Sequence, residues 1–141
     1  MTPRPIPAFA LLLALCLALV AACDSTGGTR AKLTAMDEYA AALRWNEIER
    51  ALTFVDPAVQ AARPLTDLER ERYKQLQVTG YEVKSRRDTP EGGVEQSVEV
   101  RVVNRNTQHE RIVTVQESWR WDAAAKRFWL ASGLPGLEPT P

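Results

Sequence analysis

The sequence predicts one α+β domain, in which N-terminal helices precede an antiparallel sheet of about four strands. Three observations favour this class. The chain has 141 residues, which suits a single domain. Apolar residues recur at helical spacing from Ala31 to about Leu76, and from Gln77 onward they alternate with a period of two. Short polar, Gly-rich and Pro-rich stretches separate the alternating segments, as turns do.

The first 22 residues have the pattern of a cleavable secretion signal. Arg4 is followed by an unbroken apolar run from Ala8 to Val20, shorter than the roughly 20 residues that a membrane-spanning helix needs. The run closes with Val20-Ala21-Ala22-Cys23, and small residues before a cysteine suit a signal peptidase. One interpretation is an ordinary signal peptide in which Cys23 has no special role.

The segment Val20-Ala21-Ala22-Cys23 also resembles a bacterial lipobox, and this is the interpretation we adopt. The resemblance implies that residues 1–22 are a lipoprotein signal peptide and that the Cys23 thiol carries lipid, including palmitate. Residues 23–30 are then a lipidated, flexible tether. The expected location is a bacterial cell membrane, facing the periplasm or the cell surface, with inner and outer membrane left open. Two or more acyl chains give firm attachment.

Charge and cysteine content exclude several classes of protein. The 18 basic and 18 acidic residues cancel, so the chain has no electrostatic reason to bind nucleic acid. Its two cysteines, Cys16 and Cys23, both lie near the N-terminus, so no disulfide can cross-link the folded domain.

Two apolar stripes with helical spacing lie between Ala31 and Val55. Both follow the spacing i, i+3, i+7 and i+10, which places the side chains on one helix face. The first stripe is Leu33, Met36, Ala40 and Leu43, and the second is Trp45, Ile48, Leu52 and Val55. We expect Asn46 to cap the start of the second helix. Asp56-Pro57 should end it, because the residue before proline avoids helical dihedrals.

A third helix is predicted by the segment Thr66-Asp67-Leu68-Glu69, which matches a capping box. It should run to about Leu76. Four strands follow, separated by turns at 90–93, 106–109 and 122–126. Their predicted ranges are Val78–Arg87, Val94–Arg105, Arg111–Trp121 and Arg127–Ser132. The domain should therefore cover residues 31–134, and residues 135–141 should form a flexible Pro-rich tail.

The segments Tyr39–Asp56 and Glu117–Leu130 resemble the first helical pair and the closing Trp-rich hairpin of the nuclear-transport-factor-2-like superfamily. More narrowly, the chain is similar to uncharacterised bacterial lipoproteins that carry such a domain. The resemblance implies a curved sheet that wraps the helices into a cone with an open end. The superfamily includes dehydratases, isomerases, hydrolases, binding modules and assembly factors, so the fold does not select a function.

Glu117 is the candidate catalytic residue. It shares its predicted strand face with Val113, Val115, Trp119 and Trp121, and a carboxylate among apolar neighbours has a raised pKa. It could then act as an acid, a base or a hydrogen-bond acceptor. The alternative, which we prefer, is a bulged or edge strand on which Glu117 meets solvent or pairs with an arginine.

Aromatic residues are the candidates for ligand binding. Trp119 and Trp121 on one strand face, with Tyr39 from the first helix, could form an apolar ligand wall. The preferred alternative is ordinary packing of rings across paired strands. Phe128 and Trp129 are adjacent and must point oppositely, so at least one large ring should face outward and mark a partner surface.

Metal and cofactor sites are not expected. The single histidine, His109, falls in a predicted polar turn, and zinc needs three or four ligands. Phosphate-loop and nucleophile motifs are absent from the sequence.

These observations favour a lipid-anchored, non-enzymatic binding or assembly module of the cell envelope. Its expected partners are the membrane, an envelope protein or a small apolar ligand, and a second copy of the chain. The alternative function is a cofactor-independent lyase or isomerase that uses Glu117 with Tyr39 or Tyr81 inside the cone.

Overall fold

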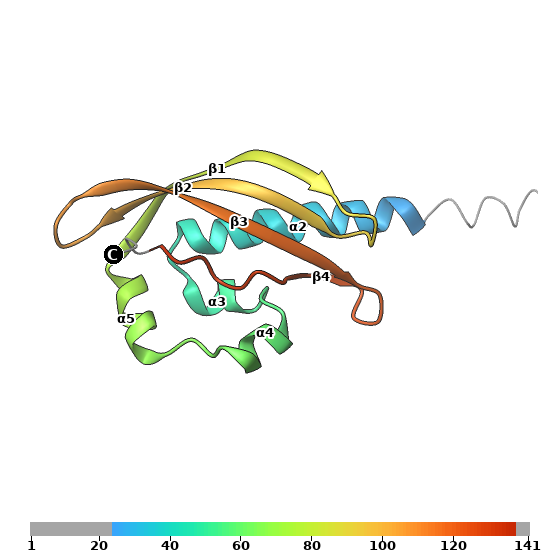
Figure 1. Ribbon diagram of the computed structural model, residues 1–141, viewed down its shortest axis with the longest axis horizontal. Helices are drawn as coiled ribbons and strands as arrows, with labels where there is room; N and C mark the ends of the chain where they lie inside the picture. The colour runs from blue at the N-terminus through green and yellow to red at the C-terminus, as the bar shows by residue number, and fades with distance from the viewer. Residues whose placement is uncertain (1–23, 138–141) are drawn as a thin grey trace, which may run out of the picture.

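Four helices precede a four-stranded antiparallel sheet in the computed structural model, which describes residues 24–137 (Figure 1). The α+β class is therefore confirmed. The signal peptide predicted at 1–22, the lipidation site Cys23 and the last four residues lie outside the described residues. The helices are α2 (Asp24–Arg44), α3 (Ile48–Leu52), α4 (Pro57–Ala62) and α5 (Asp67–Lys74). The strands are β1 (Leu76–Asp88), β2 (Val94–Asn104), β3 (Glu110–Asp122) and β4 (Arg127–Leu130).

The sheet has the order β1-β2-β3-β4, with each strand antiparallel to the next, so the predicted meander is confirmed. Figure 1 shows β1 and β2 arching over α2 and β3 crossing it diagonally, while α3, α4 and α5 lie below α2 in this view. The β1–β2 ladder shifts register between Val78 and Gly80 and again between Val83 and Ser85. Such bulges bend a strand and increase its twist.

The core lies between the concave side of the sheet and the helices. One cluster joins α2 and α3 to β3 and β4, and a second joins β1 and β2 to the C-terminal segment. The largest fully buried side chains are Trp119, Tyr39, Leu43, Leu130, Val94, Val98, Val100 and Val102. The alternation of valines predicted for the second strand is therefore its buried face.

Asn46 ends the first helix instead of capping the second, which corrects the sequence prediction. Its φ is +58°, its N–H donates to the Leu43 carbonyl at 3.1 Å, and the Glu47 N–H donates to the Ala42 carbonyl at 2.8 Å. This pair of bonds is a Schellman motif, in which asparagine tolerates the left-handed position after a helix. The N-cap of α3 is Glu47, which makes no side-chain capping bond.

The turn at Asn46 also explains why the second apolar stripe is wrong at its first member. Trp45 lies between α2 and the left-handed residue, and it is 77% exposed. A stripe holds its phase only along an uninterrupted helix, and here the chain changes direction after Trp45. The first stripe also loses its first member, because Leu33 is 43% exposed although it lies within α2.

The second helix was expected to end at Asp56-Pro57, but α3 ends earlier, at Leu52, and Asp56-Pro57 begins α4, a helix that the sequence did not predict. Pro57 occupies the first position of α4, where its missing N–H costs nothing, and the Asp56 carboxylate accepts from the Ala58 N–H at 2.9 Å. The predicted capping box is confirmed at α5. Thr66 Oγ1 accepts from the Glu69 N–H at 3.2 Å, and Glu69 Oε2 accepts from the Thr66 N–H at 2.8 Å.

Both ends of the described chain are more ordered than the composition predicted. Helix α2 begins at Asp24, so residues 24–30, expected to be a flexible tether, form its first turns. Extending an existing helix adds one hydrogen bond for each residue fixed. Residues 135–137 were expected to be a flexible tail. They pack onto the sheet instead: Pro135 and Leu137 are buried, and the Tyr73 hydroxyl donates to the Pro135 carbonyl.

Candidate functional site

Glu117 is buried on the concave face of β3, with only 2% of its surface exposed. The strand pattern places it in line with the inward-facing Val115 and Trp119, as the period of two predicted. The preferred alternative, in which Glu117 meets solvent or pairs directly with an arginine, was therefore wrong. Residues on both sides of it alternate without a bulge in the β2–β3 ladder, so nothing turns the carboxylate outward.

Three donors from three strands surround the Glu117 carboxylate. The Tyr81 hydroxyl on β1 lies 2.8 Å from Oε1 and 2.9 Å from Oε2. Gln96 on β2, the direct cross-strand neighbour of Glu117, donates from Nε2 to Oε2 at 2.7 Å. Trp119 Nε1 donates to Oε2 at 3.2 Å. Buried charges are stable only when their oxygens are hydrogen-bonded in this way.

An exposed cation completes the row across the sheet. Arg86 on β1 is paired in register with Gln96, and its Nε donates to Gln96 Oε1 at 2.9 Å. The Gln96 amide therefore accepts a hydrogen bond from the solvent-exposed guanidinium of Arg86 and donates one to the buried carboxylate of Glu117. This cluster consists of the buried Gln96, Glu117 and Trp119 and the half-buried Tyr81.

Burial raises the pKa of Glu117 above its ordinary value. The hydrogen bonds from Gln96, Tyr81 and Trp119 favour the ionised form and work against burial, as does the positive charge of Arg86. Burial beside this carboxylate also raises the pKa of Tyr81 well above its ordinary value. Tyr81 therefore stays a phenol that donates to Glu117.

Tyr39 lies next to this cluster but is not joined to it by a hydrogen bond. Its ring packs edge-on against Trp119 at 5.4 Å and against Phe54 at 6.2 Å. Its surface is fully buried, and its hydroxyl has no hydrogen-bond partner within residues 24–137. Burial raises the pKa of Tyr39. Of the two tyrosines proposed to act with Glu117, the structure pairs Tyr81 with it and leaves Tyr39 beside Trp119.

The remaining aromatic candidates divide between the two faces of the sheet. Trp121 contacts Phe128 across the β3–β4 pair, with ring centroids 4.9 Å apart, and Phe128 is buried. Trp129 points the other way. Its Nε1 donates to Asp122 at 3.2 Å, and the Arg127 guanidinium lies 3.8 Å above its ring. Trp129 is thus the large aromatic ring that we expected, from the sequence, to lie on the outer face of the sheet.

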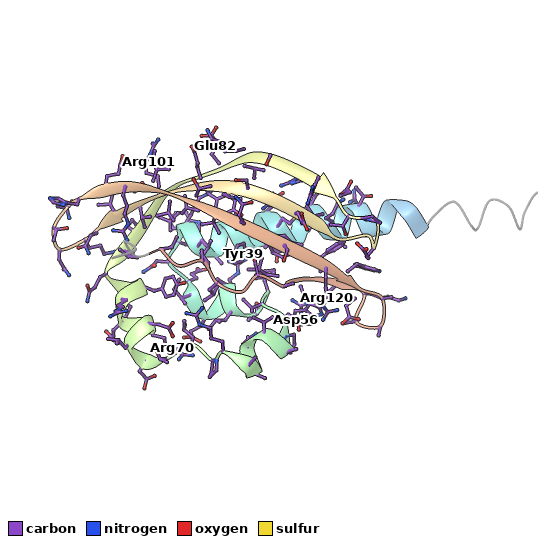
Figure 2. All side chains as sticks on the ribbon, viewed as in Figure 1. Tyr39, Asp56, Arg70, Glu82, Arg101 and Arg120 are labelled. Carbon is purple, nitrogen blue, oxygen red and sulfur yellow. The ribbon has the colours of Figure 1, made fainter. Side chains whose placement is uncertain are left out.

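A polar cluster that the sequence did not indicate joins α4 to β3. Asp56 is 6% exposed and accepts from Arg120 Nε at 2.6 Å, across 64 residues of sequence. The Arg120 hydrogen bond holds the pKa of Asp56 below its ordinary value. Arg120 also lies 3.7 Å from Asp122. Figure 2 labels Asp56 and Arg120 close together, at the end of the molecule near β4.

A cavity of about 290 Å³ lies away from Glu117, between the three short helices and the C-terminal segment. Most of its lining residues are apolar, but polar and apolar atoms contribute about equally to its surface. The polar residues are Gln60, Arg63, Glu69, Arg72 and Ser132. The apolar lining comes from Leu52, Val55, Val59, Pro64, Leu65, Tyr73, Leu76, Leu134, Pro135 and Leu137, with Gly133 and Gly136. No local pattern could have indicated this cavity, because its walls come from segments about 70 residues apart.

A second hollow, of about 230 Å³, lies over β1 and β2 where Glu82 and Arg101 are labelled in Figure 2. Its lining includes Tyr81 and Ile112 but not Glu117. Neither of these two hollows is lined by Glu117, Trp119, Trp121 or Tyr39. The aromatic candidates are packed as parts of the sheet and the core.

Other features of the described chain concern metals and membranes. No group of three His, Cys, Asp or Glu side chains within residues 24–137 is arranged to hold a metal ion. His109 is exposed in the turn between β2 and β3, as expected. Among the helices of the described part, none is long and apolar enough to cross a membrane.

Comparisons with known proteins address the fold alone. No protein-family model matches the chain, and no curated protein matches it. The solution structure of a SEC-C motif-containing protein from Rhodopseudomonas palustris is similar, with a TM-score of 0.56 and 12% sequence identity. The similarity covers 69% of this chain and 72% of that one. The structure and this comparison define the chain as an α+β domain with a buried carboxylate cluster and a separate cavity lined by apolar and polar residues.

Proposed function

We propose that this chain is a lipid-anchored binding module of the bacterial envelope, and that the cavity between α3, α4, α5 and the C-terminal segment takes a small apolar ligand. The observation that carries the proposal is the cavity itself. Its volume of about 290 Å³ is close to the lower end of ligand pockets, and its lining combines apolar side chains with several polar ones. The lipobox-like segment ending at Cys23 supports the membrane anchor.

The surroundings of Glu117 favour binding over catalysis as the function. Its two oxygens already accept from Tyr81, Gln96 and Trp119, and it lines neither of the two hollows. A general acid or base must come within hydrogen-bond reach of the substrate. The satisfied carboxylate instead fits a role in holding three strands in register.

The anchor is tested at Cys23. Cells that express the full chain should incorporate labelled palmitate into it, and the Cys23→Ser variant should stay an unlabelled precursor. Cys16→Ser is the matched control, because it changes the other cysteine and leaves the lipobox-like segment intact. Label in the Cys23→Ser protein would contradict the anchor.

The binding role is tested on the full chain in phosphatidylcholine nanodiscs, with a panel of small apolar compounds. Saturable binding above that of empty nanodiscs is expected, and Val59→Phe should reduce it by filling the cavity. The Val59 side chain reaches to within 3.5 Å of where a Cβ at Gly133 would stand. Val83→Phe, at an exposed position of β1 that lines neither hollow, is the matched control. Equal binding by both variants, or no binding at all, would contradict the proposal.

We also propose that the fold is a cone of the nuclear-transport-factor-2-like kind. The arrangement of α2 under an arched four-stranded meander supports this relationship (Figure 1). An experimental structure of the full chain tests it. The proposal requires α2 to lie within the concave side of the sheet, and α2 on the convex side would overturn it.

A further inference from the structure

The cavity has an uneven distribution of charge. Its lining contains two guanidinium groups, Arg63 and Arg72, and one carboxylate, Glu69. Arg63 pairs with Glu69 at 3.3 Å, so the lining offers this guanidinium to another anion only where the pair opens. The Arg63 side chain is 85% exposed, which places it at the opening and not in the apolar wall.

Glu69 is occupied by the start of its own helix. Its Oε2 accepts from both the backbone N–H and the hydroxyl of Thr66 at 2.8 Å, and these bonds lower its pKa. Its contact with Arg63 is longer, at 3.3 Å. Strong pairs between a guanidinium and a carboxylate are about 2.7–2.9 Å apart. Arg63 can therefore turn towards another anion at little cost, while Glu69 continues to cap α5.

The amide of Gln60 limits where the charged group of a ligand can lie in the cavity. Its two N–H groups donate to the carbonyls of Leu52 at 2.9 Å and Val55 at 3.0 Å, so both donors are used to hold α3 against α4. The inner wall thus offers no amide donor to an anion, and burying a charge without a donor is costly. A charged group is better satisfied at the opening, where the exposed Arg63 lies.

We propose that the cavity binds a small amphipathic carboxylate, with its apolar body inside and its carboxylate facing Arg63 at the opening. This inference rests on the proposed binding function and names its ligand class. A neutral or cationic ligand of the same length would gain the apolar contacts but not this attraction.

The test compares three eight-carbon probes: octanoate, octanol and octylammonium. Each is titrated into the full chain in phosphatidylcholine nanodiscs, and empty nanodiscs give the background from the bilayer. For octanoate labelled with ¹³C at the carboxyl carbon, the chemical shift of bound ligand separates a site beside a guanidinium from the bilayer. Arg63→Gln is the test variant, and Arg87→Gln, an exposed arginine paired with Glu95 on the β1–β2 hairpin, is the control.

Octanoate should bind most tightly, and Arg63→Gln should weaken it by about tenfold while Arg87→Gln leaves it unchanged. Added salt should weaken the binding of octanoate more than the binding of octanol. Equal affinity for all three probes, or no effect of Arg63→Gln, would contradict the proposal that the ligand is a carboxylate. The proposed binding function would not be affected by that result. No saturable binding of any probe above empty nanodiscs would overturn both. Near-ultraviolet circular dichroism confirms that each variant is folded.

Discussion

The Tyr81 hydroxyl bridges both oxygens of Glu117, at 2.8 and 2.9 Å, although the two residues lie on strands that are not neighbours in the sheet. The tyrosine reaches across β2, where Gln96 donates to the same carboxylate. Three strands are thus joined by one buried acceptor. A slip of one residue would turn these side chains to the opposite face, so the cluster favours a single register.

Replacing Glu117 should show how burial of its negative charge lowers the free energy of unfolding. The folded-state pKa is raised above the ordinary 4.5, so the folded protein holds this proton at higher pH than the unfolded chain. The stability it contributes is fully present below the unfolded pKa and is lost as pH rises through the folded pKa. Glu117→Gln should therefore gain stability relative to the parent as pH rises, by up to about 1.4 kcal/mol per pH unit in that window.

Urea unfolding at several pH values between about 4 and about 8 measures this difference. The Tyr81 hydroxyl can accept from the new amide, so the variant is expected to fold. Glu95→Gln, on the outer face of β2, is the matched control and should show a much smaller trend. A parent and a Glu117→Gln variant with parallel pH profiles would contradict a raised pKa.

Asp56 should stabilise the protein through two separate bonds, one to the Ala58 N–H and one to Arg120. Asp56→Ala removes both and should cost about 2 kcal/mol at neutral pH, while Asp56→Asn keeps the cap and should cost about half as much. Because the pKa of Asp56 is lowered, its contribution is present above the ordinary 3.8 and is lost as pH falls through the folded pKa.

A double-mutant cycle between Asp56→Asn and Arg120→Gln, measured by urea unfolding, isolates the pair. A coupling energy that vanishes near neutral pH would show that the contact adds nothing to stability.

Asn46 should respond to substitution as a residue that ends a helix. At a φ of +58°, Asn46→Gly should leave stability unchanged or raise it, while Asn46→Ser should cost about 1 kcal/mol. The opposite order is expected for an N-cap, where serine replaces asparagine well and glycine is slightly worse. Thermal or urea unfolding of the two variants distinguishes the two roles.

Leu137 should contribute to the core even though it lies in a Pro-rich segment. It is 2% exposed and packs with Leu76 and Val78, so Leu137→Ala should cost about 2–3 kcal/mol. Leu68 is 61% exposed, and Leu68→Ala should change stability by no more than about 0.5 kcal/mol. Equal effects of these two substitutions on urea unfolding would place residues 135–137 outside the fold.

Local sequence patterns were sufficient wherever the structure depends on neighbouring residues. The period-two alternation gave the four strands and the inward direction of Glu117, and Thr66 with Glu69 marked the start of α5. Patterns failed where the chain changes direction. Asn46 serves either end of a helix, and only the path of the following residues decides which one.

The candidate site was only partly visible from the sequence. Glu117 could be assigned to the apolar face, but its donors Tyr81 and Gln96 lie 36 and 21 residues away. Whether that carboxylate is satisfied or faces an open cavity depends on how the strands pair. The alternative preferred from the sequence was wrong for this reason.

The sequence by itself determined the α+β class, the order of the strands and most of their turns, because these follow from local dihedral preferences and from the burial of one face. It also supplied the lipobox-like segment at Cys23, which consists of adjacent residues. Only the tertiary structure decided that Asp56 meets Arg120 and that residues 132–137 close a cavity against α3, α4 and α5. These contacts join segments about 70 residues apart, and such contacts depend on the packing of the whole domain and not on any local pattern.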